Sequence, residues 1–163
     1  MARSIANESL GATVVTGVVA GAAGGLAEVA WVALYATISG GNAAVIAQGV
    51  TTAAGVDALF PGAAVGAGVA VHMILSVALG LLLAVAARPV AIGRSVRVFS
   101  IAALFAVWCV NFFVILPLVS PAFTHLLPYA VSLTSKLLFG VAAGQVFAMQ
   151  ARRLPYAPAA VRR

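Results

Sequence analysis

The sequence predicts an all-α integral membrane protein, a bundle of four transmembrane helices with both termini in the cytoplasm. The first observation is composition: 64% of the 163 residues are hydrophobic and only 7% are charged, whereas a soluble domain carries about 25% charged residues. The second is that long apolar stretches recur along the chain. The third is that arginines gather at alternate connections between these stretches, which is how the orientation of a membrane protein is set.

Four stretches are long enough to cross a bilayer, which takes about 20 mostly apolar residues. They are residues 13–39, 63–87, 98–119 and 128–150. The first contains Glu28 and is longer than the roughly 7–15 apolar residues of a secretory signal, so we expect an uncleaved span. The sequence therefore predicts one membrane domain, residues 13–150, between a cytoplasmic segment 1–12 and a basic cytoplasmic tail 151–163.

Positive charge predicts the orientation of these spans. Arg3 precedes the first span, three arginines lie between the second and third, and four follow the last. The other two connections, residues 40–62 and 120–127, contain no lysine or arginine. Because positively charged loops stay in the cytoplasm, both termini are predicted to be cytoplasmic and these two connections to face outward. The chain has the general look of small four-span bacterial inner-membrane proteins, so we expect it in the cell inner membrane.

The longer outer connection, residues 40–62, leaves two alternatives open. Its middle, residues 43–54, is too short to span a membrane and only mildly polar. It is either a short helix that lies at the interface or dips back into the membrane, or an ordinary loop with a helical turn or two. In either form it would cover a site in the outer half of the bundle.

One strongly polar residue lies inside each span. These residues are Glu28, His72, Asn111 and Lys136. Each lies about 8–10 residues from the predicted outer end of its span, which at 1.5 Å per residue is about 12–15 Å below the outer surface. Ionisable residues inside a membrane cost about 2.5–3.5 kcal/mol on insertion scales and mark functional sites by default. The shared depth therefore predicts one cluster that binds a ligand or a proton.

Small residues share a helix face with three of these four polar residues. The glycines on these faces are Gly17, Gly21, Gly24 and Gly25 in the first span, Gly68 and Gly80 in the second, and Gly140 and Gly144 in the fourth. Those of the first span include a double G-x-x-x-G pattern, which lets a neighbouring helix approach closely. If the three faces meet, the carboxylate, the imidazole and the ammonium group come together. Asn111 shares its face with bulky residues, so its place in the cluster rests on depth alone.

A weak internal repeat accompanies this arrangement. With a shift of 64 residues, "HMILSVALG" (72–80) lies on "KLLFGVAAG" (136–144), and His72 falls on Lys136. The match predicts two helix pairs of the same topology, related by an axis along the membrane normal.

Other kinds of site are disfavoured. Cys109 lies about 200° around the helix from Asn111, and the cation at Lys136 would repel a metal ion, so we expect no metal and no cofactor. The chain has no phosphate loop and no G-x-S-x-G, H-E-x-x-H or C-x-x-C motif, so we expect a protein that is not an enzyme. The net charge of +6 comes mostly from the flanking arginines, so we expect no nucleic-acid partner.

Two functional hypotheses follow. In the first, the polar cluster binds or passes a small polar ligand or a proton, in a transport-type or ligand-binding protein that works as an oligomer in the bilayer. In the second, the chain is a non-catalytic accessory or assembly subunit of a larger membrane complex, for example a respiratory or other energy-transducing one. The polar cluster is then purely structural, with Glu28 paired to Lys136.

Overall fold

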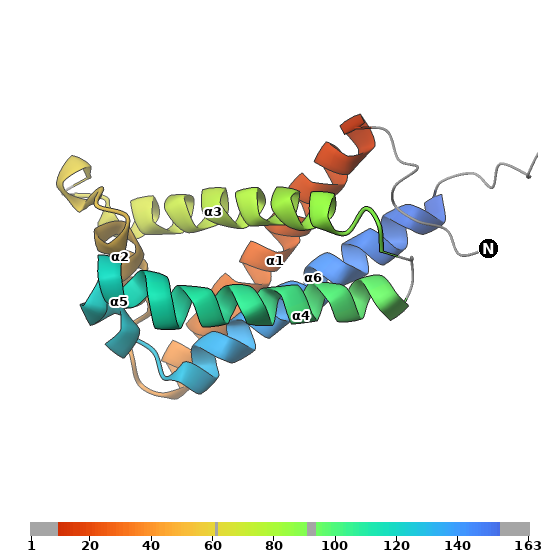
Figure 1. Ribbon diagram of the computed structural model, residues 1–163. Helices are drawn as coiled ribbons and strands as arrows, with labels where there is room; N and C mark the ends of the chain where they lie inside the picture. Colours follow the sequence, from red (N-terminus) through yellow and green to blue (C-terminus); the bar gives the residue numbers. More distant parts are fainter. Residues whose placement is uncertain (1–9, 61, 91–93, 154–163) are drawn as a thin grey trace, which may run out of the picture.

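The computed structural model describes residues 10–60, 62–90 and 94–153, and within these residues it is all-helical (Figure 1). The elements in chain order are α1 (Leu10–Ile38), α2 (Ala43–Ala53), the 3-10 helix η2 (Asp57–Leu59), α3 (Ala64–Ala86), α4 (Arg94–Val110), the π-helix η3 (Asn111–Ile115), α5 (Leu116–Val119), the 3-10 helix η4 (Pro121–His125) and α6 (Tyr129–Arg153). The predicted N-terminal segment up to residue 9 and the tail from residue 154 lie outside the described residues.

Four helices are long and apolar enough to cross a membrane: Leu10–Ile38, Ala64–Ala86, Arg94–Val119 and Tyr129–Gln150. They confirm the prediction of an all-α protein with four helices long and apolar enough to span a membrane. The largest difference from the predicted spans is at the third, which begins at Arg94 rather than at residue 98. Hydropathy marks the apolar core of a span, whereas a helix extends into the flanking arginines because its backbone hydrogen bonds continue there.

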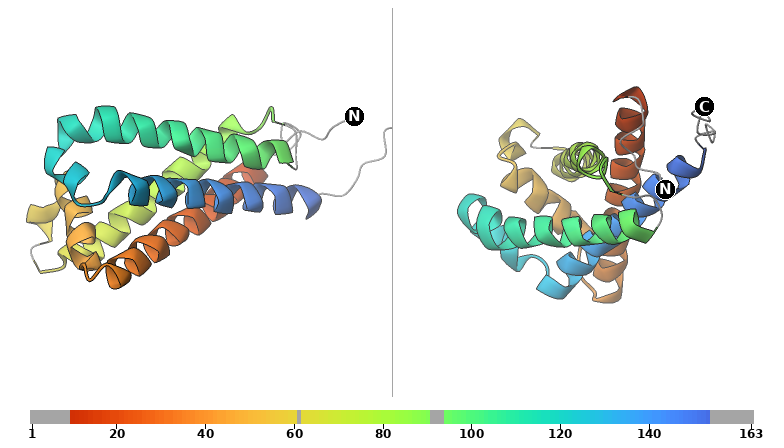
Figure 2. Two further views of the ribbon diagram at one scale, coloured as in Figure 1. Left: turned by 90° about the horizontal axis from the view of Figure 1, so that it is seen from below. Right: turned by 45° about the vertical axis from the view of Figure 1, so that its right-hand side comes forward.

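The four long helices form a row in the order α3, α1, α6, α4. The central helix α1 packs against α3 and α6, and α4 packs against α6. The ends of the row, α3 and α4, share no extensive direct packing. Figure 1 shows α1 and α6 crossing behind α3 and α4, and Figure 2 shows the same helices from below and obliquely. This open row leaves space between the helices at the end where α2 lies.

Glycines permit a close approach between α1 and α3. A Cβ atom added to Gly21 would lie 2.6 Å from the Cα atom of Val77, and one added to Gly17 would lie 2.9 Å from the Cα atom of Leu81. On the partner helix α3, Gly80 faces the backbone of Gly17 and Gly21. The double G-x-x-x-G pattern of the first span is therefore the surface on which α3 rests.

The other glycine faces do not meet as the sequence led us to expect. Gly140 and Gly144 pack against α4, where an added Cβ would lie 2.9 Å from the Cα atom of Ile101 and 3.0 Å from that of Arg97, respectively. Gly68 packs against α2, at the carbonyl of Ala47. The physical reason is that α6 packs against two helices. Its glycines lie against α4, whereas its side chain Phe139 lies against α1.

The connection between α1 and α3 is a helix, α2, which packs along the beginning of α3. Asn42 caps it by accepting a hydrogen bond of 2.9 Å from the backbone N–H of Ala44. The buried hydroxyl of Thr51 donates to the carbonyl of Ala64 at 2.7 Å. The bond from Thr51 holds α2 against α3. Of the two alternatives for the connection 40–62, the structure therefore contains the short helix.

The third long helix changes its register in the middle. At η3 the backbone N–H of Leu116 donates to the carbonyl of Asn111, five residues earlier, whereas α-helical bonds join residues four apart. Pro117 follows directly and has no backbone N–H to offer a preceding carbonyl. Short π-helical turns of this kind occur often at functional sites, and this one begins at a residue of the predicted cluster.

Candidate functional site

The site is built around Glu28, which is only 2% exposed at the middle of α1. The ammonium nitrogen Nζ of Lys136 lies 2.8 Å from Oε1 and 2.9 Å from Oε2 of the carboxylate. The hydroxyl of Ser135 donates a third contact, to Oε1 at 3.0 Å. Both partners come from α6, so this carboxylate ties the two central helices of the row together.

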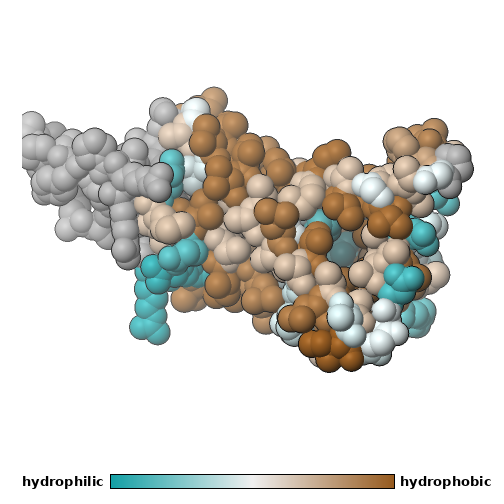
Figure 3. All heavy atoms as spheres, turned by 180° about the vertical axis from the view of Figure 1, so that it is seen from behind, coloured by the Kyte–Doolittle hydropathy of each residue, from teal (hydrophilic) through white to brown (hydrophobic). Residues whose placement is uncertain are grey.

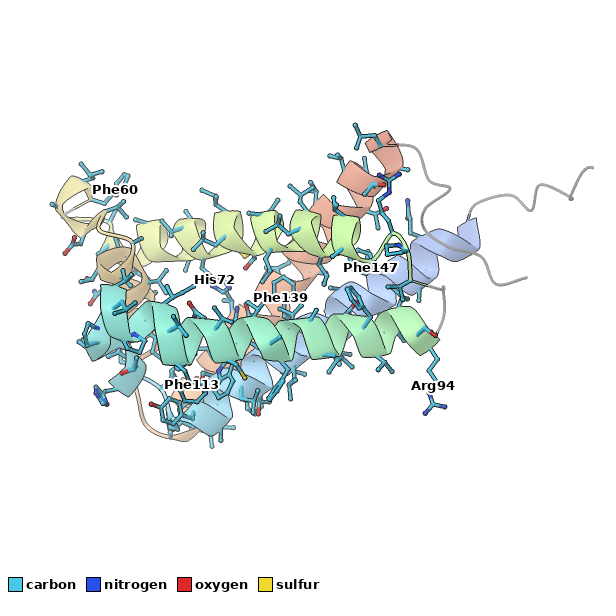
Figure 4. All side chains as sticks on the ribbon, viewed as in Figure 1. Phe60, His72, Arg94, Phe113, Phe139 and Phe147 are labelled. Atoms are coloured by element: carbon cyan, nitrogen blue, oxygen red, sulfur yellow. The ribbon has the colours of Figure 1, made fainter. Side chains whose placement is uncertain are left out.

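His72, labelled on α3 in Figure 4, lies near the same carboxylate. Its Nε2 atom lies 3.6 Å from Oε2 of Glu28, 3.4 Å from the carbonyl of Gly25 and 3.4 Å from the hydroxyl of Ser76. Because two of these neighbours only accept hydrogen bonds, the arrangement favours the tautomer that carries its proton on Nε2. The other ring nitrogen, Nδ1, is then an acceptor.

The ammonium group of Lys136 is also held by an aromatic ring. Its Nζ atom lies 5.7 Å from the ring centroid of Phe139, within the range of a cation–π contact. Phe139 is fully buried and its ring occupies the space beside Gly24, where a side chain on α1 would collide with it. The glycine thus positions the ring, and the ring and the carboxylate together position the ammonium group.

A cavity of about 520 Å³ adjoins this cluster. Its walls come from α1, α2, α3, α6 and the segment η3–α5. The polar residues that line it are Glu28, His72, Ser76, Asn111, Ser132, Ser135 and Lys136, and the remaining lining residues are apolar or small. All four polar residues singled out in the sequence therefore line one cavity.

Asn111 belongs to this cavity although the sequence placed it there by depth alone. It is half-buried at the first position of the π-helix η3. The helix face it shares with Ser100, Leu104 and Trp108 is buried, so the bulky residues on that face do not turn it toward lipid. Among the residues that the structure describes, none forms a hydrogen bond with the side-chain amide of Asn111. This leaves both donors and the acceptor of the amide for another molecule.

Two parts of the site were not predicted from the sequence. Ser135 donates to Glu28, and Phe139 contacts Lys136. Both residues lie close to Lys136 in the sequence, and that proximity was the available signal. The connection 40–62 was expected to cover a site in the outer half of the bundle, and its helix α2 supplies one wall of the cavity.

Other reactive groups lie apart from the cavity lining. Cys109 is half-buried beside the cluster of Trp108, Phe112 and Leu116. His125 is exposed at the end of η4. Within the described part of the chain, no group of three histidine, cysteine or acidic residues is placed to hold a metal ion.

The site therefore contains a carboxylate, an ammonium group, an imidazole and a side-chain amide, in a cavity whose other lining residues are mostly apolar. Such a site can hold a polar group by hydrogen bonds or move a proton between neighbouring groups. No protein-family model, curated protein or solved structure matches the chain. The functional argument therefore rests on the geometry of this site.

Proposed function

We propose that this chain is a small multi-pass inner-membrane protein that binds a small ligand through a polar group held at Glu28, His72, Asn111 and Lys136. The observation that carries the proposal is that these four residues, from four different helical segments, line one cavity of about 520 Å³. Ligand-binding cavities commonly measure about 300–1,000 Å³ and combine an apolar lining with a few convergent polar groups. The proposed activity is binding or passage, without catalysis.

The geometry supports a working site over a purely structural ion pair for two reasons. A structural pair needs only its own hydrogen bonds, and Lys136 and Ser135 already supply those of Glu28. The cavity adds nothing to such a pair, and neither does the side-chain amide of Asn111, which has no hydrogen-bonding partner among the described residues. Both features have a use if another molecule occupies the space.

Proton transfer is the second candidate, favoured by the position of His72. Its Nε2 atom lies 3.4 Å from the hydroxyl of Ser76 and 3.6 Å from the Glu28 carboxylate. These distances exceed a strong hydrogen bond, so a water molecule or a small motion would have to complete the path. Histidine is suited to this role because its ordinary pKa of about 6.5 lies near neutrality.

The competing proposal is an accessory subunit of a larger membrane complex, in which the cluster only fixes how α1 and α6 align. Both proposals share a setting: a lipid bilayer, cytoplasmic termini, and assembly as a homo-oligomer or with other membrane proteins. The distribution of arginines along the chain supports the orientation. Neither proposal includes a nucleic-acid partner.

The deciding experiment compares two variants of one helix. Val32 of α1 lines the cavity, whereas Val19 of the same helix is half-exposed away from it. The wild-type chain, Val32→Phe and Val19→Phe would be extracted from membranes into lipid nanodiscs without detergent. Small molecules retained by each would then be measured by mass spectrometry. We expect a molecule retained by the wild type and by Val19→Phe and lost from Val32→Phe.

A second measurement addresses the proton. The full chain and the double variant Glu28→Gln with Lys136→Met would be placed in proteoliposomes that contain a pH-sensitive dye. We expect a proton leak in the wild type that the double variant loses. If no molecule is retained and both liposomes hold their pH gradient equally, the site proposal is wrong and the accessory-subunit proposal replaces it.

A further inference from the structure

We infer that the cavity takes an uncharged amphiphile from the bilayer: a molecule with an apolar body and a carbonyl or hydroxyl head that reaches Lys136 and Asn111. The inference rests on the proposed ligand-binding function and names the class of ligand. It follows from where the cavity opens, from what closes its other side, and from the charge of the groups at its floor.

The cavity opens sideways, between the two ends of the helix row. Leu75 on α3 and Ile115 on η3 both line it and are nevertheless 60% and 46% exposed. Val119 on α5 also lines it and is 63% exposed. Side chains that line a cavity while remaining exposed form its rim. This rim is apolar and belongs to helices long and apolar enough to span a membrane, so we expect it to face lipid.

The opposite face of the molecule is also hollowed near the α2 end. Seen from behind, Figure 3 shows a hollow there, with mostly hydrophobic residues beside it and hydrophilic atoms at its floor. Between Leu75 and Ile115, a ligand meets apolar side chains first and the polar lining residues last. That order suits an amphiphile whose head leads and whose tail remains among the lipids.

The helix α2 closes the cavity at the end of the bundle where it lies. Its contribution to the lining is entirely apolar and includes Ala47, Val50 and Ala53. It is held in place by the hydroxyl of Thr51 on the carbonyl of Ala64 and by its contact with Gly68. A small water-soluble ligand would have to pass this apolar wall, whereas a lipid-soluble ligand enters through the side.

The charge at the floor favours an uncharged head group. Glu28 and Lys136 neutralise each other at 2.8 Å, so a charged head would find no unpaired opposite charge. It would also lose its hydration, which is costly in an apolar site without a counter-charge. An anionic head would in addition lie close to the Glu28 carboxylate.

Hydrogen-bond donors remain for a neutral head. The ammonium group has three N–H donors, and its only hydrogen-bonding partner among the described residues is the carboxylate. Its side chain is 20% exposed, on the cavity side. The free amide of Asn111 supplies a second donor. Both groups line the cavity and each can donate to a carbonyl or hydroxyl oxygen of the head group.

The test uses defined probes of matched chain length in nanodiscs that contain the full chain. A photoreactive analogue of dodecanol is crosslinked to the protein, and the attached residues are mapped by mass spectrometry. Unlabelled dodecanol, undecyl methyl ketone, dodecane, dodecanesulfonate and dodecyltrimethylammonium then compete, each kept dilute in the lipid. We expect crosslinks on cavity-lining residues and displacement by the alcohol and the ketone. The alkane and both ions should compete about tenfold less well or worse.

Two variants identify the groups responsible. Asn111→Leu should weaken the alcohol and the ketone about tenfold and leave the alkane unchanged. Val32→Phe should abolish crosslinking in the cavity, and Val19→Phe should not. If an ion competes as well as the neutral probes, the inference about the head group is wrong while the ligand-binding proposal stands. If no probe crosslinks to the cavity, the amphiphile is excluded, and the retention and proton measurements decide the proposed function independently.

Discussion

The ammonium nitrogen of Lys136 lies almost equally far from the two carboxylate oxygens of Glu28, at 2.8 Å and 2.9 Å. One cation therefore serves both oxygens, and the carboxylate is shielded so completely that it is only 2% exposed. The lysine is less enclosed, with 20% of its side chain exposed to the cavity. Because Glu28 is more buried than Lys136, the loss of stability should depend on which of the two partners is removed.

Removal of the cation should destabilise the protein more than removal of the anion. Lys136→Met leaves a buried carboxylate without its counter-charge, which costs about 3–5 kcal/mol. Glu28→Gln leaves an ammonium group that still reaches the cavity, so the loss should be smaller. The double variant should cost less than the sum of the two, because it leaves no unpaired charge. Unfolding in mixed detergent micelles would measure all three, and strictly additive losses would contradict the pairing.

The close packing of α1 on α3 should depend on Gly80. Gly80→Ala places a methyl group against the backbone of Gly17 and Gly21, and such overpacking costs about 1–3 kcal/mol. Gly66→Ala is the matched control on the same helix, because no atom lies within 4 Å of its added Cβ. We expect the control to leave stability unchanged or slightly raised. Equal losses in both variants would mean that the helices do not meet at Gly80.

The attachment of α2 should depend on the hydroxyl of Thr51. Thr51→Val removes the bond of 2.7 Å to the carbonyl of Ala64 and should cost about 1 kcal/mol. Thr52→Val changes an exposed neighbour and is the control. Hydrogen–deuterium exchange should rise across α2 only in the first variant, while α1 and α6 keep their protection. Unchanged exchange in α2 would show that other contacts hold it.

The orientation predicted from the arginines can be tested with single cysteines in a Cys109→Ser chain. Gln48 on α2 and Ser95 at the beginning of α4 are both exposed. We expect a membrane-impermeant thiol reagent to label Gln48→Cys in intact cells and to label Ser95→Cys only after the membrane is opened. The reverse pattern would invert the topology and place the cavity in the cytoplasmic half.

Much of the architecture was predictable from the sequence. The four spans follow from runs of apolar residues, since water-exposed surface cannot be built from so few charges. The shared depth of Glu28, His72, Asn111 and Lys136 follows from helical rise alone. Depth is the coordinate that a sequence predicts most directly, because helical rise converts the number of residues along a span into a distance.

Rotation about each helix axis was predictable only in part. Periodicity identifies which residues share a face, but it does not say which neighbour that face meets. The G-x-x-x-G glycines of α1 meet α3, as expected, and Gly24 meets Phe139 of α6. Gly140 and Gly144 instead meet α4, and Gly68 meets α2. The π-helical turn at Asn111 was also not predictable from helical periodicity, because it changes the register of the side chains within one helix.

The sequence by itself determined that one strongly polar residue lies inside each of four long apolar segments. Only the tertiary structure decided that these polar residues line a common cavity, that Ser135 and Phe139 complete the ion pair, and that α2 closes one end. The physical reason is that depth depends on each segment alone. The order of helices in the row instead depends on how all their surfaces fit together, and that order decides which side chains meet and where a space remains.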